Sequence, residues 1–353
     1  MPTTSANEAW LRQHSEPPLE PERPICDAHH HLWDFRRDTV HPRYLLDEYL
    51  AELASGHRIV STVFIECGAM WRAESVGDAL GLRSVRYVGE TEFVNGIAAM
   101  SASGQYGEAR VAAGIVGTVE LTEGARVAEA LDRHLSTAPD RFRGIRQAVA
   151  RDDEPEAPRH RTNPPPGLLA DKSFRDGFAT LAPRGLHFEC WCYHPQLDEL
   201  TELARAFPET TIVLNHYGGP LRVGRYRQSL QEEFRRWRQS IEALARCPNV
   251  FCKTGGLLME MNGFDFHLNQ RPPNSMEVAD AMRPFFTHAL SQFGAERCLF
   301  ESNFPVDKVS CSYGVLWNAF KRLASDLSEG EKRSLFHDNA ARLYRLPVFD
   351  DRP

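Results

Sequence analysis

The sequence has no pair of cysteines at C-x-x-C spacing, although it contains 8 cysteines. Most of them lie in apolar runs such as L-H-F-E-C-W-C at residues 186–192, where a free thiol behaves as a small hydrophobic group. A disulfide framework is therefore not expected, and a reducing, cytoplasmic setting fits this cysteine usage best.

The sequence also lacks an apolar run long enough to span a bilayer and a basic stripe that would bind phosphates. Its net charge is -7, from 41 basic and 48 acidic residues. We therefore expect a small-molecule substrate as the partner, with no nucleic acid and no membrane, and association into a homo-oligomer stays open. Residues 1–24 are rich in Pro and Glu and lack the apolar core of a signal peptide, so we expect a flexible or wrapping arm.

Three catalytic signatures are missing as well. The sequence has no G-x-S-x-G elbow, no Walker A motif and no glycine-rich turn after the first strand-like run. These absences argue against an α/β-hydrolase serine enzyme, a P-loop nucleotidase and a dinucleotide-binding sheet. Where the glycine-rich turn would stand, this chain carries histidines.

Strand-like apolar runs alternate with stretches that have helical spacing, which predicts βαβ units and a parallel sheet. Nine runs qualify: 24–29, 59–66, 94–100, 112–119, 142–147, 186–193, 211–215, 250–254 and 298–300. We predict a single (β/α)8 TIM barrel of the metal-dependent hydrolase type over residues 25–346, between an arm (1–24) and a tail (347–353). One run is in excess of the eight that a barrel needs. The long segment 256–274 is expected to cap the site, and the Pro-rich segment 155–166 is interpreted as a surface loop.

Polar residues follow or end these runs, and in a parallel barrel those strand ends meet on one face. His29 and His31 point to the same side of the first strand and are our first candidate metal ligands, for Zn²⁺ or Mn²⁺. Glu66 and His194 are further candidate ligands. For Glu66 an ion pair with an arginine such as Arg146 is the alternative, and for His194 a polar rim position.

The catalytic candidates are His216, beside a Gly-Gly-Pro turn, and the group Glu301, Asn303 and Asp307 after the last strand. One of the two carboxylates could act as a general base for water. The candidate substrate contacts are four: Arg146 and Lys253 as cations for an acidic group, and Trp191 and Tyr217. For Lys253, a salt bridge across the barrel mouth is the alternative.

These motifs resemble the amidohydrolase-2 family, in its lactonase-like branch. The likeness rests on D-A-H-H-H-L-W (27–33), F-R-G-I-R (142–146), H-P-Q-L (194–197), V-L-N-H (213–216), Lys253 with G-G-L (255–257) and S-N-F-P-V (302–306). The resemblance implies a (β/α)8 barrel, His29 and His31 as metal or substrate ligands, His194 and His216 as the histidines of the middle strands, and Arg146 facing a substrate carboxylate. Members of the family hydrolyse lactones, relatives decarboxylate aromatic acids, and some of the lactonases work without a metal.

The chain departs from the family pattern at Asn303, where members usually carry an aspartate that serves as metal ligand and base. An amide cannot take up a proton at neutral pH and can bind a metal only through its neutral oxygen. Either the base is Glu301, Asp307 or Glu66, or the chemistry differs from that of the family. The leading expectation is metal-assisted hydrolysis of a lactone or cyclic ester of an acidic small molecule. The alternatives are a metal-dependent decarboxylase of an aromatic acid and a barrel that only binds a small ligand.

Overall fold

Eight parallel strands form one sheet in the computed structural model, which describes residues 3–73, 81 and 83–347. The strands are β1 (Ile25–His30), β2 (Ile59–Ile65), β3 (Arg110–Gly117), β4 (Phe142–Arg146), β5 (His187–Cys190), β6 (Ile212–Leu214), β7 (Val250–Lys253) and β8 (Cys298–Leu299). They pair in sequence order from β1 to β8.

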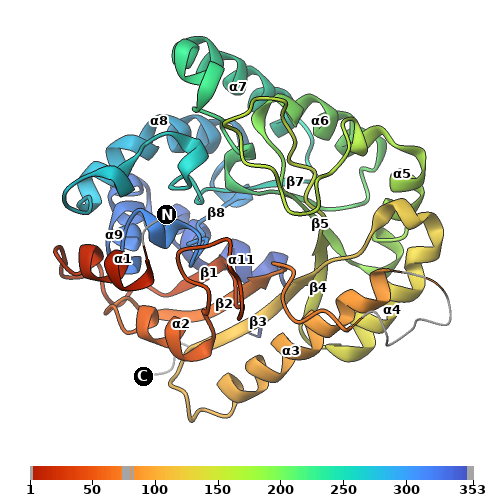
Figure 1. The fold of residues 1–353 in the computed structure, drawn as a ribbon, viewed down its shortest axis with the longest axis horizontal. Coiled ribbons are helices and arrows are strands. Elements are labelled where there is room, and N and C mark those ends of the chain that lie inside the picture. The colour runs from red at the N-terminus through yellow and green to blue at the C-terminus, as the bar shows by residue number, and fades with distance from the viewer. Residues whose placement is uncertain (1–2, 74–80, 82, 348–353) are drawn as a thin grey trace.

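The loop after β8 brings the two edges of the sheet together. The amide N–H of Asn303 donates to the carbonyl of His29 at 2.9 Å, and the N–H of His31 donates to the carbonyl of Phe304 at 2.8 Å. A parallel bridge joins His30 and Phe304. The sheet is thus a nearly closed barrel with helices around it, which confirms the predicted (β/α)8 TIM barrel (Figure 1).

Helices connect the strands on the outside of the barrel. The α-helices are α1 (Thr4–Leu11), α2 (Leu46–Leu53), α3 (Ser84–Ala102), α4 (Ala128–Thr137), α5 (Lys172–Phe178), α6 (Leu197–Ala206), α7 (Leu230–Ala245), α8 (Ser275–Phe293), α9 (Tyr313–Leu323), α10 (Glu329–Arg333) and α11 (Asn339–Leu343). Short 3-10 helices span Leu121–Val127, Leu168–Ala170, Ala182–Arg184, His194–Gln196, His216–Gly218, Gly224–Ser229, Glu260–Asn262, Phe266–Leu268, Ala295–Arg297 and Asp307–Val309, and Ser334–Asp338 forms a π-helical turn.

The ninth predicted strand, at 94–100, was wrong, because these residues belong to helix α3 (Ser84–Ala102). The buried residues Thr91, Val94, Ala98 and Ser101 recur at intervals of three and four, which is helical spacing. A short apolar run does not by itself separate a buried helix from a strand. The other eight runs coincide with or overlap the eight strands.

The C-terminal helix α11 lies near the centre of the barrel when it is viewed as in Figure 1. Residues of this helix and the turn after it pack on side chains of β1, β2, β3 and β8. Ala340, Tyr344 and Leu346 form one buried cluster with Cys26, Ala28, Val63, Ile65, Ala113, Val116 and Leu299. The Tyr344 hydroxyl donates to Glu189 on β5 at 2.6 Å. The end of the described chain therefore fills the barrel interior beneath the strand ends.

All eight cysteines are free and buried, which confirms the prediction of unpaired thiols. None of the helices in the described residues combines the length with the apolar character that crossing a bilayer needs. The predicted arm contains helix α1. Residues 348–353 of the predicted tail lie outside the described residues.

A buried histidine outside the site gives a prediction about stability. His134 on α4 is fully buried, its Nε2 donates to the carbonyl of Thr118 at 3.1 Å, and its Nδ1 lies 2.8 Å from the Thr91 hydroxyl. Burial lowers the pKa of His134 to about 3. The unfolded chain therefore binds a proton here below pH 6.5 while the folded chain does not, so acidification favours unfolding.

We expect the stability difference between the protein and His134→Gln to shrink by about 2 kcal/mol from pH 6.5 to pH 5, at about 1.4 kcal/mol per pH unit. Urea unfolding at several pH values measures this difference. Parallel stability curves for the two proteins would contradict the assignment of a neutral His134.

Candidate active site

The polar side chains at the carboxyl ends of the strands meet inside the mouth of the barrel. His29 and His31 come from the end of β1, His216 follows β6, Lys253 ends β7 and Glu301 follows β8. All five side chains are buried, with at most 4% of each residue exposed. Charged and imidazole groups are rarely buried without partners, so their contacts decide what the site can do.

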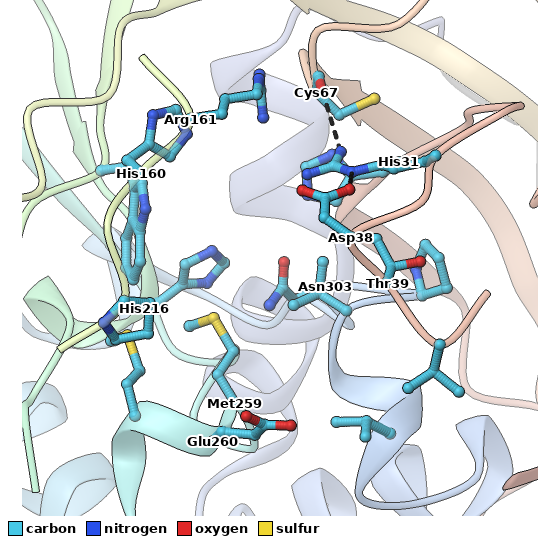
Figure 2. A pocket seen from close by; sticks show the side chains of 18 of the residues that line it. His31, Asp38, Thr39, Cys67, His160, Arg161, His216, Met259, Glu260 and Asn303 are labelled. Atoms are coloured by element: carbon cyan, nitrogen blue, oxygen red, sulfur yellow. Dashed lines mark hydrogen bonds and ion pairs between the residues drawn. The ribbon is translucent and has the colours of Figure 1, made fainter. Parts of the chain in front are cut away.

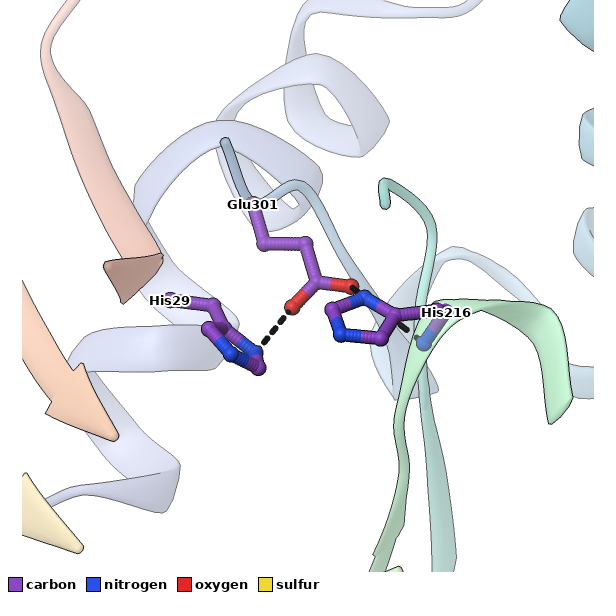
Figure 3. Close-up of side chains that lie close together, drawn as sticks. All are labelled: His29, His216 and Glu301. Carbon is purple, nitrogen blue, oxygen red and sulfur yellow. Dashed lines mark hydrogen bonds and ion pairs between the residues drawn. The ribbon is translucent and has the colours of Figure 1, made fainter. Parts of the chain in front are cut away.

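Glu301 stands between two imidazoles (Figure 3). Its Oε1 accepts a hydrogen bond from His216 Nδ1 at 2.6 Å, and its Oε2 lies 2.7 Å from His29 Nδ1. Oε2 has no hydrogen-bond partner of good geometry among the described residues. The donor atoms of His29, His216 and Glu301 all lie within 4.8 Å of one another, which is close enough for a shared cation.

The hydrogen-bond partners assign the protons on the rings. A carboxylate and a carbonyl can only accept, so His216 carries its proton on Nδ1 toward Glu301, and His31 carries its proton on Nδ1 toward the Ile65 carbonyl at 2.8 Å. Donor-only groups approach both nitrogens of His29, because Arg146 Nη1 lies 3.3 Å from Nε2 and Lys253 Nζ lies 3.4 Å from Nδ1. We assign the His29 proton to Nδ1 because the Glu301 carboxylate, at 2.7 Å, is the nearest polar group to that nitrogen. Burial lowers the pKa of His29 and of His31 well below the usual value, so both rings are neutral.

The lone pairs of His29 Nε2 and His31 Nε2 therefore face each other at 3.2 Å. Two acceptors at this distance repel unless a cation or a proton lies between them. Histidines that ligate metals commonly donate their other ring N–H to a carboxylate or a carbonyl, as His31 does to the Ile65 carbonyl. The donor set thus fits a divalent cation.

Two glycines make room for the histidine–glutamate group. Gly256 has φ +70, and a Cβ there would lie 1.9 Å from His216 Nδ1. A Cβ on Gly255 would lie 2.1 Å from the Glu301 carbonyl oxygen. The pair Gly255–Gly256 therefore lets the loop after β7 pass close to both His216 and Glu301.

Asp27 ties β1 to the loop after β8. Its carboxylate accepts from the hydroxyls of Tyr49 at 2.8 Å, Ser302 at 2.6 Å and Tyr313 at 2.9 Å, and from the Ser302 N–H at 2.8 Å. Asp27 is fully buried and does not line the cavity. These hydrogen bonds fix the relative positions of His29, two residues after Asp27, and Glu301, the residue before Ser302.

The cations Arg146 and Lys253, which we expected to contact the substrate, are both held by buried carboxylates. Arg146 Nε donates to Glu66 Oε1 at 2.9 Å, and Lys253 Nζ donates to Glu189 Oε2 at 2.6 Å. Burial alone would raise the pKa of Glu66, but Arg146 and Arg161 hold it below the usual value. Burial also opposes ionisation of Glu189, and Lys253 outweighs it, so the pKa of Glu189 is lowered as well.

A cavity of about 340 Å³ opens above the histidines (Figure 2). Its wall is built by the segments after β1, β2, β4, β5, β6, β7 and β8. It is lined by His31, Trp33, Arg36, Asp38, Thr39, Val40, His41, Cys67, Arg146, Pro158, Arg159, His160, Arg161, Trp191, Tyr193, His216, Met259, Glu260, Met261, Asn303, Pro305, Val306 and Val309. The segment 256–274 contributes Met259 to Met261, so it does cap the cavity as expected.

The other candidate residues are placed as follows. Asn303 lines the cavity, and its Nδ2 donates to Asp307 at 2.9 Å. Asp307 is fully buried and does not line the cavity, and this burial raises its pKa to about 8. Trp191 lines the cavity, whereas Tyr217 is buried outside it, with its ring against Phe285.

Two of the four predicted metal ligands lie apart from the paired histidines. His194 accepts the Leu221 N–H at 3.1 Å, and its Nε2 lies 3.3 Å from Glu233, so its ring turns toward α7 and not into the cavity. Glu66 accepts from Arg146 and from Arg161, the latter at 2.8 Å. The predicted set of His29, His31, Glu66 and His194 is therefore not the set that the fold brings together. Glu66 follows the alternative stated for it, an ion pair with Arg146.

The sequence reasoning missed the cations of the Pro-rich segment. Arg159, His160 and Arg161 line the cavity from the loop after β4, although we interpreted that segment as a surface loop. The run R-H-R inside a Pro-rich stretch was the available signal. It carries no strand or helix pattern, so nothing in it indicated which way the loop folds.

The chain is similar to a protein-family model, to curated proteins and to solved structures. A family model described as Amidohydrolase matches residues 26–346. The chain is 31% identical to "Uncharacterized protein y4mH" of Sinorhizobium fredii, over 91% of this chain and 98% of that protein. It is 24% identical to an L-fucono-1,5-lactonase of Burkholderia multivorans, over 91% of this chain and 96% of that protein. A solved structure of an amidohydrolase from Burkholderia multivorans with bound zinc superposes with a TM-score of 0.66 at 23% identity, over 92% of this chain and 99% of that chain.

Proposed function

This chain belongs to the amidohydrolase family, and from that premise we propose that it hydrolyses a lactone or similar cyclic ester of an acidic small molecule. The observation that carries the proposal is the His216–Glu301 pair at the floor of a cavity lined by cations and aromatic rings. The distant L-fucono-1,5-lactonase relatives support a lactone as the substrate class.

His216 is the proposed general base. With its proton held on Nδ1 by Glu301, its Nε2 keeps a lone pair, and the residue lines the cavity. Water attacks the lactone carbonyl as His216 Nε2 takes one of its protons, the ring C–O bond breaks, and the proton passes to the leaving alkoxide. The products are a hydroxyl group and a carboxylic acid, which releases its proton to solvent and becomes a carboxylate. This role needs no carboxylate at position 303.

A divalent cation, Zn²⁺ or Mn²⁺, is proposed to be held by the Nε2 atoms of His29 and His31. The cluster of His29, His216 and Glu301 is not chosen, because its facing ring nitrogens carry protons in this assignment. The bound zinc of the Burkholderia multivorans structure supports this choice of metal. When bound, the cation supplies Lewis-acid polarisation of the carbonyl. The chain's own contribution is to present two neutral imidazoles whose Nδ1 protons point away from the metal.

The cavity favours a ligand with an anionic end and a less polar body. Arg159 has no ion pair or hydrogen bond among the described residues. Arg36 and Arg161 line the same cavity, but they are ion-paired with Asp38 and Glu66. Apolar side chains line much of the remaining wall: Trp33, Trp191, Met259, Val306 and Val309. Arg159 replaces Arg146 and Lys253 as the proposed partner of a substrate carboxylate, because each of those two already donates to a buried carboxylate, Glu66 or Glu189.

The function is tested with a panel of lactones, with and without a free carboxylate, by following acid release in a pH-indicator assay. We expect turnover of a carboxylated lactone, loss of activity on chelation and recovery with Zn²⁺ or Mn²⁺. Arg159→Gln should raise KM for that lactone roughly 10- to 100-fold, the effect of one charge-assisted hydrogen bond.

Arg37→Gln is the matched control, because Arg37 is an exposed neighbour of the same rim that does not line the cavity. It should leave KM unchanged. Release of CO₂ from an aromatic acid, with no acid release from any lactone, would contradict the proposal in favour of decarboxylation. Binding of a lactone without turnover, with or without metal, would indicate a barrel that only binds.

A further inference from the structure

The N-terminal helix α1 lies outside the residues that the family model matches, yet it contacts the wall of the cavity. The loop after β1 and the loop after β8 form adjoining parts of that wall, through Val40 and His41 on one and Val309 on the other. Helix α1 is hydrogen-bonded to both loops. It lies beside α9 in Figure 1.

Asn7 of this helix joins the two loops with one amide group. Its Nδ2 donates to the Val309 carbonyl at 3.2 Å, and its Oδ1 lies 3.1 Å from His41 Nε2. The Val309 carbonyl can only accept, so the amide orientation is determined, and His41 must donate from Nε2. Asn7 is 3% exposed and His41 is 4% exposed, so both groups depend on each other for hydrogen bonding.

Three further contacts hold the helix against the same loops. The Thr4 hydroxyl donates to the Val40 carbonyl at 2.5 Å. Lys308, next to Val309, lies 2.5 Å from a carboxylate oxygen of Glu8. The Trp10 indole N–H donates to the Asn269 carbonyl at 2.9 Å, in the loop that also caps the cavity. The helix therefore ties three mouth loops to one another.

We propose that Asn7 is a positioning residue for the substrate cavity, which fixes the wall formed by His41 and Val309 from outside the barrel. It does not line the cavity, so it acts through those two residues. The N-terminal arm then contributes to the site by fixing the positions of the two mouth loops that form this part of the cavity wall. The consequence for turnover rests on the proposed function, whereas the consequence for the loops does not.

The test compares Asn7→Ala with Ser5→Ala by amide hydrogen exchange in the full-length protein. Ser5 is exposed on the same helix and has no side-chain hydrogen bond among the described residues. We expect Asn7→Ala to speed exchange about tenfold or more in both segments 36–44 and 303–311, with the barrel strands unchanged, and Ser5→Ala to have no effect.

Thr4→Val gives a second, milder variant, because it removes only the hydroxyl that reaches Val40. It should speed exchange in 36–44 and leave 303–311 protected. With a lactone that the protein turns over, Asn7→Ala should raise KM about tenfold and change kcat less than about twofold. Unchanged exchange in both segments of Asn7→Ala would overturn the proposal, whether or not any lactone is a substrate. An equal loss of kcat and kcat/KM would overturn the positioning role.

Discussion

Glu301→Gln is expected to lower kcat by about 10³- to 10⁴-fold while the barrel stays folded. Glu301 accepts at Oε1 from His216 Nδ1, and its Oε2 lies 2.7 Å from His29 Nδ1, so its negative charge favours a proton on Nδ1 of both rings. A glutamine has one acceptor oxygen and one NH₂ group, and its NH₂ must face one of the two rings. That ring has to move its proton to Nε2. Loss of the correct tautomer costs about 10⁴ in kcat in serine-protease triads, where a carboxylate has the same role toward a histidine.

Steady-state kinetics on the active lactone, with circular dichroism as the check on folding, measures this effect. Glu260→Gln is the matched control, because Glu260 is an exposed carboxylate on the cavity wall with no contact to the histidines among the described residues. It should retain kcat. Metal content of Glu301→Gln separates the two rings: a change at His29 lowers metal affinity, and a change at His216 lowers kcat with metal still bound. Full activity of Glu301→Gln would exclude the His216–Glu301 pair as the base.

Lys253→Met is expected to destabilise the protein by about 3–5 kcal/mol, the usual cost of leaving a buried carboxylate without its counter-ion. Lys253 and Glu189 are both fully buried, and Lys253 Nζ lies 2.6 Å from Glu189 Oε2. Asn215 and Tyr344 would still donate to Glu189, at 2.8 and 2.6 Å, but neither neutralises its charge. The methionine fills most of the lysine volume, so the loss reports the charge and not a cavity.

The double variant Glu189→Gln with Lys253→Met should recover most of that stability, because it removes both charges. Urea unfolding gives the free energies for the double-mutant cycle. Arg205→Ala, which breaks an exposed pair with Glu202, is the control and should cost less than about 1 kcal/mol. If the single and double variants are equally unstable, the pair has no coupling and the loss comes from packing.

The barrel could be predicted from the local pattern of apolar residues, except where a short apolar run fits both a strand and a buried helix. The run at 59–66 is apolar and β-branched, and it forms β2. The run at 94–100 is equally apolar, yet it continues a helix whose buried face starts ten residues earlier. The difference lies in the residues around the run, because a helix is recognised by its spacing over several turns and a strand by a few residues.

The candidate site could be predicted as a set of strand ends, but its contacts could not. His29, His31, His216 and Glu301 were expected together, and they meet at the barrel mouth. His194 was expected with them on the same reasoning. Its ring turns toward Glu233 instead, because the chain bends into the 3-10 helix His194–Gln196 directly after the strand segment. Which way a side chain turns at the end of a strand depends on the backbone of the following loop.

The sequence alone determined the parallel α/β architecture and the identity of the polar groups at its strand ends, because residue spacing and the order of runs along the chain carry that information. Only the tertiary structure decided which charges pair. Arg146 pairs with Glu66, 80 residues away, and Lys253 with Glu189, 64 residues away. Such pairings join residues on or directly after strands that stand two apart in the sheet, β2 with β4 and β5 with β7. Inside a low-dielectric core they determine which cations remain free to meet a substrate.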